Sequence, residues 1–338
     1  MDILIKSFNR PYYLDRCLQS IYLNCIGSYF MIKVLDDGTP EKYLKKIKDK
    51  FPEIIVYKSK HYSHKSKFCE QGEKPEIMDV PIDFWIESAA KASDYFILLE
   101  DDIWFTEKVD LDTMRTDMIQ NKSVFTKLFW LGNPKLIQSK FAHQIGKLTF
   151  YQPKLYVINP ILFTFIFYKF HRFKIRQLLK FLKIHTSNRF LSYYSIYSVA
   201  GVIFNKNYFL NLWKNHENTV NEGLQLFNAL TYFNKNKYKI AFSRSNSEVL
   251  KTGFLSAATN QFKEYGVQVD MFVFNKIINE AWYKNEFDVM DNYPKDIGNY
   301  VIEKILENEN KDTIFVENWN QWVLSFKNQY LNFGCKID

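Results

Sequence analysis

The spacing of apolar residues changes repeatedly along the first part of the chain. Short apolar runs at 2–6, 30–37, 53–59 and 95–99 predict strands. Between these runs, apolar residues recur every three or four positions, which predicts helices with one buried face. This alternation of strands and helices predicts an α/β fold of the Rossmann-like kind, in which a mostly parallel sheet is flanked by helices.

Two of the predicted helices have recognisable starts. Pro11 suits the first turn of a helix, because the N–H that proline lacks would have no partner there. Thr39 is expected to cap the next helix, with Pro40 as its first residue. A third helix is expected at 84–92. The predicted buried faces of the first two helices consist of Leu14, Cys17, Leu18, Ile21, Tyr22 and Cys25, and of Tyr43, Leu44, Ile47 and Phe51.

Beyond residue 150 the pattern is less regular. A core strand is expected within 199–209, and the C-terminal part is expected to be largely helical. We therefore divide the chain into an α/β domain at 1–150, a region with a basic amphipathic segment at 151–265, and a helical region at 266–338.

Three of the predicted strands end in polar groups. These groups are Ser7-Phe8-Asn9-Arg10, Asp36-Asp37 and Glu100-Asp101-Asp102. Parallel strands place their carboxyl ends at the same edge of a sheet, which is where ligands bind in such folds. The three groups are therefore expected to lie together at one site.

The three consecutive carboxylates at 100–102 need a positive charge nearby. Mg²⁺ and Mn²⁺ prefer oxygen ligands and complete their coordination with water and substrate phosphates, so one or two carboxylates would suffice to hold them. The alternative is a helix N-terminus that carries acidic residues because they interact favourably with the helix dipole. A second acidic pair, Asp36-Asp37, at the same predicted edge favours the cation.

Composition excludes several other classes of protein. The 338 residues are 47% apolar and 24% charged, which indicates a folded chain with a sizeable core. The four cysteines lack metal-site spacing, and there is no glycine-rich phosphate loop. His61 and His64 have no acid spaced with them for a metal site, and both are expected in a loop. The longest apolar stretch, 155–168, is too short to span a bilayer, and no signal peptide is recognised, so a cytosolic protein is expected.

Charge is distributed unevenly along the chain. The stretch from Lys122 to Lys214 carries 15 Lys and Arg and no Asp or Glu, whereas the rest of the chain carries a net charge of −7. Three interpretations remain open: docking on an anionic membrane, nucleic-acid binding, which is the least favoured, and an ordinary solvated basic face. The bases that alternate with aromatic residues are Lys169, Arg172, Lys174, Arg176, Lys180 and Lys183.

The motifs of the first 110 or so residues resemble those of the GT-A glycosyltransferases, especially the large inverting family that uses nucleotide-diphosphate sugars. "SFNRPYYLDRCLQSI" is similar to the opening strand, turn and helix of that family. "VLDDGTPEKYL" resembles its Asp-Asp-Gly-Ser segment, and "ASDYFILLEDDIWF" resembles its Asp-x-Asp strand. The three motifs occur in the expected order.

The resemblance implies roles for these residues in binding a donor. Ser7, Asn9 and Arg10 of the first turn would bind the donor, with Asn9 and Arg10 beside the nucleotide. Asp37 would accept a hydrogen bond from the base, with Asp36 close to it. Asp102 would ligate Mn²⁺ or Mg²⁺, while Asp101 and Glu100 would contact the ribose, the sugar or metal-bound water.

An inverting enzyme also needs a base that accepts the proton of the acceptor hydroxyl. In the family this residue lies well after the metal motif, at the start of a helix. The segment "HENTVNEGLQLFNAL" offers Glu222, which we favour, and Glu217. The alternative is that Glu222 is a solvated residue at a helix N-terminus.

One residue departs from the family pattern. Many metal-using relatives have a histidine before a late glycine, but here Lys251 precedes Gly253 in "SEVLKTGF". A protonated lysine cannot ligate a metal, although it can pair with a phosphate. Lys251 is therefore expected either to bind the diphosphate, which would make the metal dispensable, or to lie on the surface.

The sequence as a whole predicts a glycosyltransferase. It would move a hexose or N-acetylhexosamine from a nucleotide diphosphate, with UDP favoured, to a glycan or lipid-linked glycan hydroxyl with inversion. A cytoplasmic enzyme of bacterial surface-polysaccharide synthesis is expected, and association with the inner face of the membrane would suit a lipid-linked acceptor. Two rivals are a sugar nucleotidyltransferase, whose glycine-rich loop is absent, and a non-catalytic basic module that binds membranes or nucleic acid.

Overall fold

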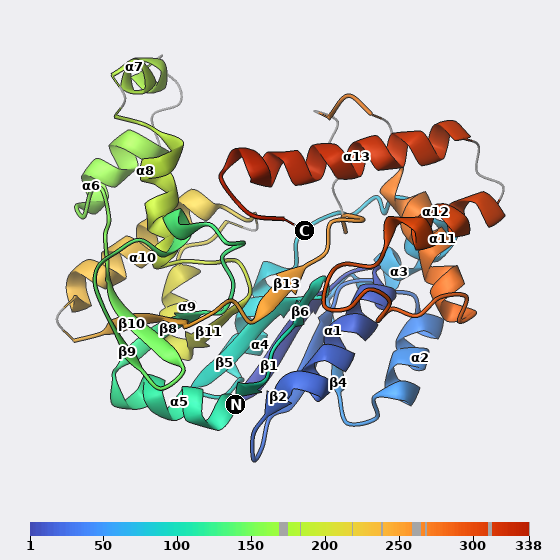
Figure 1. The fold of residues 1–338 in the computed structure, drawn as a ribbon, viewed down its shortest axis with the longest axis horizontal. Coiled ribbons are helices and arrows are strands. Elements are labelled where there is room, and N and C mark those ends of the chain that lie inside the picture. Colours follow the sequence, from blue (N-terminus) through green and yellow to red (C-terminus); the bar gives the residue numbers. More distant parts are fainter. Residues whose placement is uncertain are drawn as a thin grey trace.

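A mixed nine-stranded sheet forms the centre of the computed structural model (Figure 1). The structure describes residues 1–168, 175–182, 184–217, 219–237, 239–258, 265–267, 269–309 and 313–337. In their order across the sheet, the strands are β4 (Ile55–Lys58), β3 (Met31–Asp36), β1 (Asp2–Ser7), β5 (Tyr95–Glu100), β11 (Val202–Asn205), β8 (Ser123–Lys127), β12 (Ala241–Ser245), β10 (Leu148–Pro153) and β9 (Ser139–Ile145).

Most strands of this sheet run in one direction. The strands β4, β3, β1 and β5 are parallel to one another, as are β8 and β12. Only β11 and β10 run the opposite way among the strands of this sheet that the structure describes. The predicted α/β class with a mostly parallel sheet is confirmed. Strands β11 and β12 complete the same sheet from beyond residue 150.

Helices cover both faces of the sheet. The longer ones are α1 (Pro11–Asn24), α2 (Glu41–Lys50), α3 (Tyr62–Gln71), α4 (Ile82–Ala90), α5 (Leu111–Gln120), α10 (Glu222–Asn236), α11 (Met271–Tyr283), α12 (Asn299–Asn308) and α13 (Thr313–Asn332). The shorter ones are α6 (Pro160–Phe163), α7 (Ile175–Phe181), α8 (Ser187–Leu191), α9 (Lys206–Leu212) and the turns η1 (Pro134–Ile137), η2 (Thr164–Tyr168) and η3 (Ser192–Ser195). Helices α11, α12 and α13 confirm the predicted helical C-terminal part, and none of the described helices is long and apolar enough to cross a bilayer.

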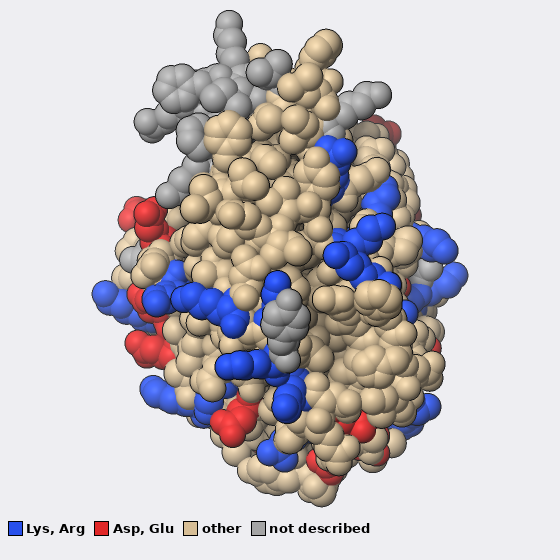
Figure 2. Space-filling view, turned by 90° about the vertical axis from the view of Figure 1, so that its left-hand side faces the viewer, with Lys and Arg blue, Asp and Glu red and all other residues tan. Residues whose placement is uncertain are grey.

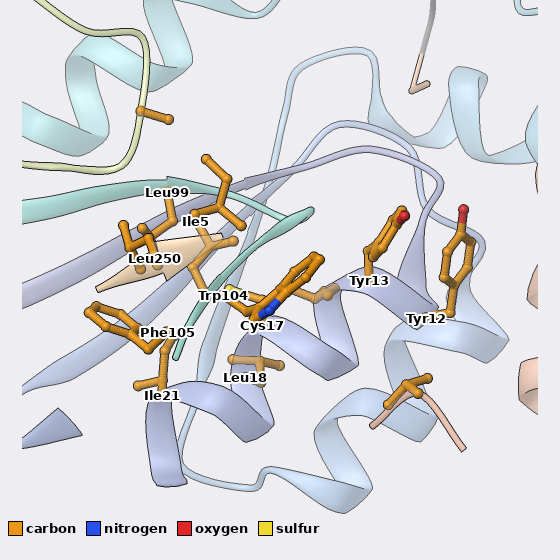
Figure 3. Packing of buried hydrophobic residues seen from close by; sticks show 14 of the residues in the cluster. Ile5, Tyr12, Tyr13, Cys17, Leu18, Ile21, Leu99, Trp104, Phe105 and Leu250 are labelled. Carbon is orange, nitrogen blue, oxygen red and sulfur yellow. The ribbon is translucent and has the colours of Figure 1, made fainter. Parts of the chain in front are cut away.

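The alternation of side chains along the strands divides the core into two layers. Ile3 and Ile5 of β1 belong to a cluster with α1, α2 and the C-terminal helices, whereas Leu4 belongs to a cluster with α4, α9 and α10. On the first side, α1 packs against the short ribbon of β6 (Ile103–Phe105) and β13 (Leu250–Thr252). Figure 3 shows Cys17 and Tyr13 of α1 beside Trp104 of β6. The turn at 101–102 joins β5 to β6, and this packing holds it close to the start of α1.

Some local predictions were wrong. Helix α2 begins at Glu41, and Thr39 does not cap it, because its hydroxyl accepts from the N–H of Asn9 and donates to Asp36 instead. Tyr22 is 43% exposed, so the buried face of α1 is narrower than predicted. The segment with His61 and His64 is not a loop: His64 lies within α3, and His61 precedes its first residue. Cys25 lies just after the end of α1 and begins a short strand, β2 (Cys25–Ile26), that pairs with β7 (Val109–Asp110).

Candidate functional site

The carboxyl ends of β1, β3 and β5 meet at one edge of the sheet, as predicted. In the parallel register, Ser7 lies opposite Asp36, and Lys6 lies opposite Glu100. The pairing continues past the strand ends, because the N–H of Asp101 donates to the carbonyl of Lys6 at 3.0 Å. All three polar groups therefore lie together.

The guanidinium of Arg10 occupies the centre of this edge. One of its terminal nitrogens donates to Asp101, and the other donates to Asp102 at 2.8 Å. The side chains of Arg10 and Asp101 are 7% and 2% exposed, and that of Asp102 is 14% exposed. Burial raises the pKa of Asp101 to about 7, even though the charge of Arg10 acts to lower it. The positive charge that balances the carboxylates thus comes from the chain itself.

Two lysines balance the other acids at this edge. Lys6 donates to Glu100 at 2.7 Å, and although burial raises the pKa of Glu100, the charge and hydrogen bond of Lys6 bring it below its usual value. Lys65 of α3 donates to Asp37 at 2.7 Å with its side chain 2% exposed. Burial raises the pKa of Asp37 in spite of this hydrogen bond. These pairs place three cations beside the acids.

A cavity of about 340 Å³ opens onto these pairs. Its lining combines charged groups with apolar groups from α4, from the segment between α3 and α4, and from parts of the chain beyond residue 198. The lining consists of Lys6, Ser7, Phe8, Arg10, Asp37, Lys65, Met78, Asp79, Val80, Pro81, Trp85, Glu100, Asp101, Val199, Trp213, Val220 and Ala258. A cavity of this size and mixed polarity can hold a small polar ligand.

Asn9 and Asp36 lie behind this wall. Asp36 is fully buried, and its carboxylate accepts from the N–H groups of Gly38 and Thr39 at 3.0 and 2.8 Å. Burial raises its pKa to about 6. Asn9 is also fully buried, with a φ of 54°, and its carbonyl accepts from Asn279 of α11. Both residues therefore shape the turns that carry Arg10 and Asp37.

Glu222 follows Val220, which lines the cavity, by two residues, but Glu222 is not part of the lining. It is the first residue of α10 and accepts a hydrogen bond from Tyr194 at 2.5 Å. Burial raises the pKa of Tyr197, and the charges of Glu222 and Glu100 raise it further. Glu217 is exposed and does not line the cavity. Neither glutamate lines the cavity, and the two differ in that Glu222 is held by the hydroxyl of Tyr194.

Lys251 belongs to a second cavity, of about 190 Å³, on the outer side of the β6–β13 ribbon. It lies there with Glu248, Asp296, Lys327 and Lys336, and burial lowers its pKa. Its strand nevertheless touches the site, because the N–H of Gly253 donates to the carbonyl of Asp102 at 2.9 Å. Lys251 does not line the cavity that holds Arg10.

The arrangement of the acids can be tested for a divalent cation. Oδ1 of Asp102 is buried and has no hydrogen-bond partner among the described residues, so this oxygen is available. The other oxygen of Asp102 and the carboxylate of Asp101 already hold Arg10. Among the described residues, no group of three His, Cys, Asp or Glu side chains could hold a metal. Asp101 and Asp102 would have to release Arg10 first, so this arrangement does not fit Mn²⁺ or Mg²⁺.

Comparison with known proteins gives distant structural likenesses only. No protein-family model and no curated protein match the chain. Similar solved structures include TarS 1–349 of S. aureus, with 10% identity, a TM-score of 0.42, and coverage of 97% of this chain and 91% of that one. TarS 1–349 with UDP-GlcNAc gives 11% identity, a TM-score of 0.39 and the same coverage. Galactosyltransferase LgtC with donor and acceptor sugar analogs gives 12%, 0.33, and coverage of 68% and 70%. The chain's own site residues support the function proposed below.

Several residues of the site could not be predicted from the local sequence. Lys65 lies in a helix with few regularly spaced apolar residues, so its local sequence is that of a solvent-exposed lysine. Tyr194 precedes Glu222 by 28 residues, and no local pattern connects the two. Tyr330 of α13 lies close enough to Asp102 and Glu100 for their charges to add to the burial that raises its pKa. A tyrosine two residues before the end of a long helix gives no sign of this.

Proposed function

We propose that the protein is a glycosyltransferase that moves a sugar from a nucleotide diphosphate, with UDP favoured, to the hydroxyl of a glycan or lipid-linked glycan with inversion. A hexose or N-acetylhexosamine would be transferred, at the cytoplasmic side of a membrane, in bacterial surface-polysaccharide synthesis. The observation that carries this proposal is the 340 Å³ cavity, because five of the residues expected to bind the donor line it together: Ser7, Arg10, Asp37, Glu100 and Asp101.

Charge and polarity in the cavity suit a nucleotide diphosphate. Lys6, Arg10 and Lys65 line it and provide positive charge for phosphate oxygens. Asp37 faces the cavity beside Phe8, so that a base could donate a hydrogen bond to the carboxylate while its ring contacts the phenyl group. We therefore propose that the nucleoside lies toward Asp37 and the sugar toward Glu100.

Glu222 is the proposed base. In the transfer, the acceptor oxygen forms a bond to the anomeric carbon while the bond from that carbon to the diphosphate oxygen breaks. Glu222 accepts the hydroxyl proton, and the electron pair of the broken bond leaves with the diphosphate. Its position at the start of α10, held by the hydroxyl of Tyr194, supports this role. The metal ion expected from the sequence stays a prediction, and the proposed transfer does not require it.

Calorimetric titration of UDP, GDP and dTDP into the protein tests donor binding. We expect UDP to bind and the Asp101→Asn variant to bind it at least about tenfold more weakly. Asp94→Asn is the matched control, because Asp94 is 79% exposed and does not line the cavity. If none of the three nucleotides binds, the glycosyltransferase proposal is wrong, and the non-catalytic module is favoured.

A second assay distinguishes a glycosyltransferase from a sugar nucleotidyltransferase. Incubation with UDP-sugar and a glycan acceptor should release UDP, whereas a nucleotidyltransferase would release UTP when pyrophosphate is added. Glu222→Gln should abolish transfer and leave UDP binding unchanged, because the amide cannot accept the proton. Transfer at the wild-type rate in this variant would remove Glu222 from the role of base.

A further inference from the structure

Large apolar side chains are exposed together on α6 and at the end of α7. Ile161 is 76% exposed and Phe181 is 83% exposed, and each has a half-exposed neighbour, Leu162 or Leu182. Both helices project at one end of the molecule beside α8 (Figure 1). Exposed apolar residues gathered in this way indicate an interaction surface. We call Ile161, Leu162, Phe181 and Leu182 the apolar tip.

The apolar tip is fixed to the body of the protein by a second apolar face. Phe163, Phe167 and Leu179 are buried on the inner side of the same segments. Phe167 packs against Tyr193 of η3, with ring centroids 5.5 Å apart. The side chain of Asn159 accepts from the first N–H groups of α6, which fixes the start of that helix. The helices therefore present apolar residues outward while their inner faces remain buried.

The surroundings of the apolar tip are basic. No acidic residue occurs between Asp117 and Glu217, a stretch that includes all of α6, η2, α7 and α8. Lys180, which precedes Phe181, is exposed, and so is Lys154, which follows β10. Of the other bases expected in this segment, Lys169, Arg172, Lys174 and Lys183 lie outside the described residues, as does the side chain of Arg176. Figure 2 shows Lys and Arg side chains across the middle of this face, which we call the basic band, and mostly uncharged side chains among the described residues above it.

We propose that the apolar tip inserts into the surface of an anionic lipid bilayer, with the basic band at the level of the headgroups. An apolar projection above a basic band matches the order of layers in such a bilayer, in which anionic headgroups lie outside the hydrocarbon. A nucleic acid would be bound by the basic band alone and would leave Ile161 and Phe181 in water. This docking rests on the proposed function, in which the acceptor is a lipid-linked glycan and therefore lies at a bilayer.

The docking surface is connected to Glu222. At the end of η2, the hydroxyl of Tyr168 accepts a hydrogen bond from Asn221, the cap of α10, at 2.9 Å. The ring of Tyr168 also covers Gly223, where an added Cβ would come within 2.3 Å of it. Docking would therefore bring the start of α10 close to the bilayer, where a lipid-linked acceptor would present its hydroxyl.

Co-sedimentation of the full chain with lipid vesicles tests this docking. Vesicles of phosphatidylcholine alone are compared with vesicles that also contain phosphatidylglycerol, without any donor or acceptor. We expect binding to the anionic vesicles, little binding to the neutral ones, and about fivefold weaker binding for each of Lys154→Gln and Lys180→Gln. The double variant Ile161→Ser/Phe181→Ser should bind at least about tenfold more weakly. Equal binding to both kinds of vesicle would overturn the proposal.

A matched variant controls for the loss of apolar surface. Ile314 and Leu324 of α13 are 65% and 55% exposed, and they lie outside the apolar tip. Ile314→Ser/Leu324→Ser should bind vesicles as the wild type does. An equal loss in both double variants, or no loss in the variant of the tip, would refute insertion at α6 and α7. UDP binding in vesicle-free solution is measured in parallel, so failure of the proposed function is seen separately from failure of docking.

Discussion

Replacing Arg10 by methionine tests how far the acids at the sheet edge depend on an internal cation. Methionine has a similar length and no charge, so the variant leaves the carboxylates of Asp101 and Asp102 buried beside each other without the cation that balances them. Removing one partner of a buried ion pair costs about 3–5 kcal/mol. We expect the free energy of unfolding of Arg10→Met to fall by that amount at about pH 8.

The loss should depend on pH. An acid whose pKa is raised by folding binds its proton more tightly in the folded state, so stability falls as pH rises from the ordinary pKa toward the raised one. Burial already raises the pKa of Asp101 to about 7, and loss of Arg10 removes the charge that opposes this rise. At about pH 5 both carboxyls can be protonated in the variant, and the difference from the wild type should shrink by at least half.

Denaturation by urea at the two pH values measures both effects. Lys58→Met is the matched control, because Lys58 pairs with Glu41 across side chains that are 41% and 66% exposed. Such an exposed pair contributes at most about 1 kcal/mol. If Arg10→Met costs no more than Lys58→Met at about pH 8, or costs the same at both pH values, then Arg10 is not the cation that balances these acids.

Three further predictions concern the same edge and its surroundings. First, burial raises the pKa of both Asp36 and Asp296 to about 6, so wild-type stability should fall by several kcal/mol between about pH 4 and pH 7 in urea titrations; a flat profile would contradict the buried placement of these acids. Second, Mn²⁺ should raise the melting temperature of Arg10→Met and leave that of the wild type unchanged, because Arg10 holds the carboxylates that a cation would need; stabilisation of the wild type would show that Arg10 yields to the metal. Third, Tyr194→Phe removes the hydroxyl that holds Glu222, so the transfer rate should fall by about tenfold while UDP affinity stays unchanged; a change in affinity alone would assign Tyr194 to donor binding.

The local sequence predicts the sheet edge well and the opposite half of the sheet poorly. Strands β1, β3 and β5 were predictable because apolar runs end in polar groups at the turn, and hydrophobic burial decides both features. Strand β8 was not predicted because its buried side chains include the polar residues Ser123 and Thr126. Their hydroxyl groups are hydrogen-bonded to the hydroxyl of Ser243 in β12, at 2.8 and 2.6 Å. Polar residues that pair across strands conceal a core strand from a pattern of apolar residues.

The same limit applies to the site. Arg10, Asp37 and the acids at 100–102 were predicted, because chain order and strand direction alone bring them to one edge. Their partners were not predicted, because Lys65, Tyr194 and Tyr330 reach the site only through the packing of helices against the sheet. A lysine that is buried because it pairs with an acid has the same local sequence as a lysine that is exposed.

The pairing of Asp37, Glu100, Asp101 and Asp102 with cations of the chain bears on how a ligand would bind. Arg10, Lys6 and Lys65 come from three separate elements, and each is held by a carboxylate that also lines the cavity. Ion pairs that served stability alone would gain nothing from facing an open cavity, because water there weakens them and the desolvation of both partners is already costly. A diphosphate can take over the hydrogen bonds of the cations, and the hydroxyl groups of a sugar can donate to the carboxylates that are released. The arrangement therefore favours a ligand that carries both kinds of group, as a nucleotide sugar does.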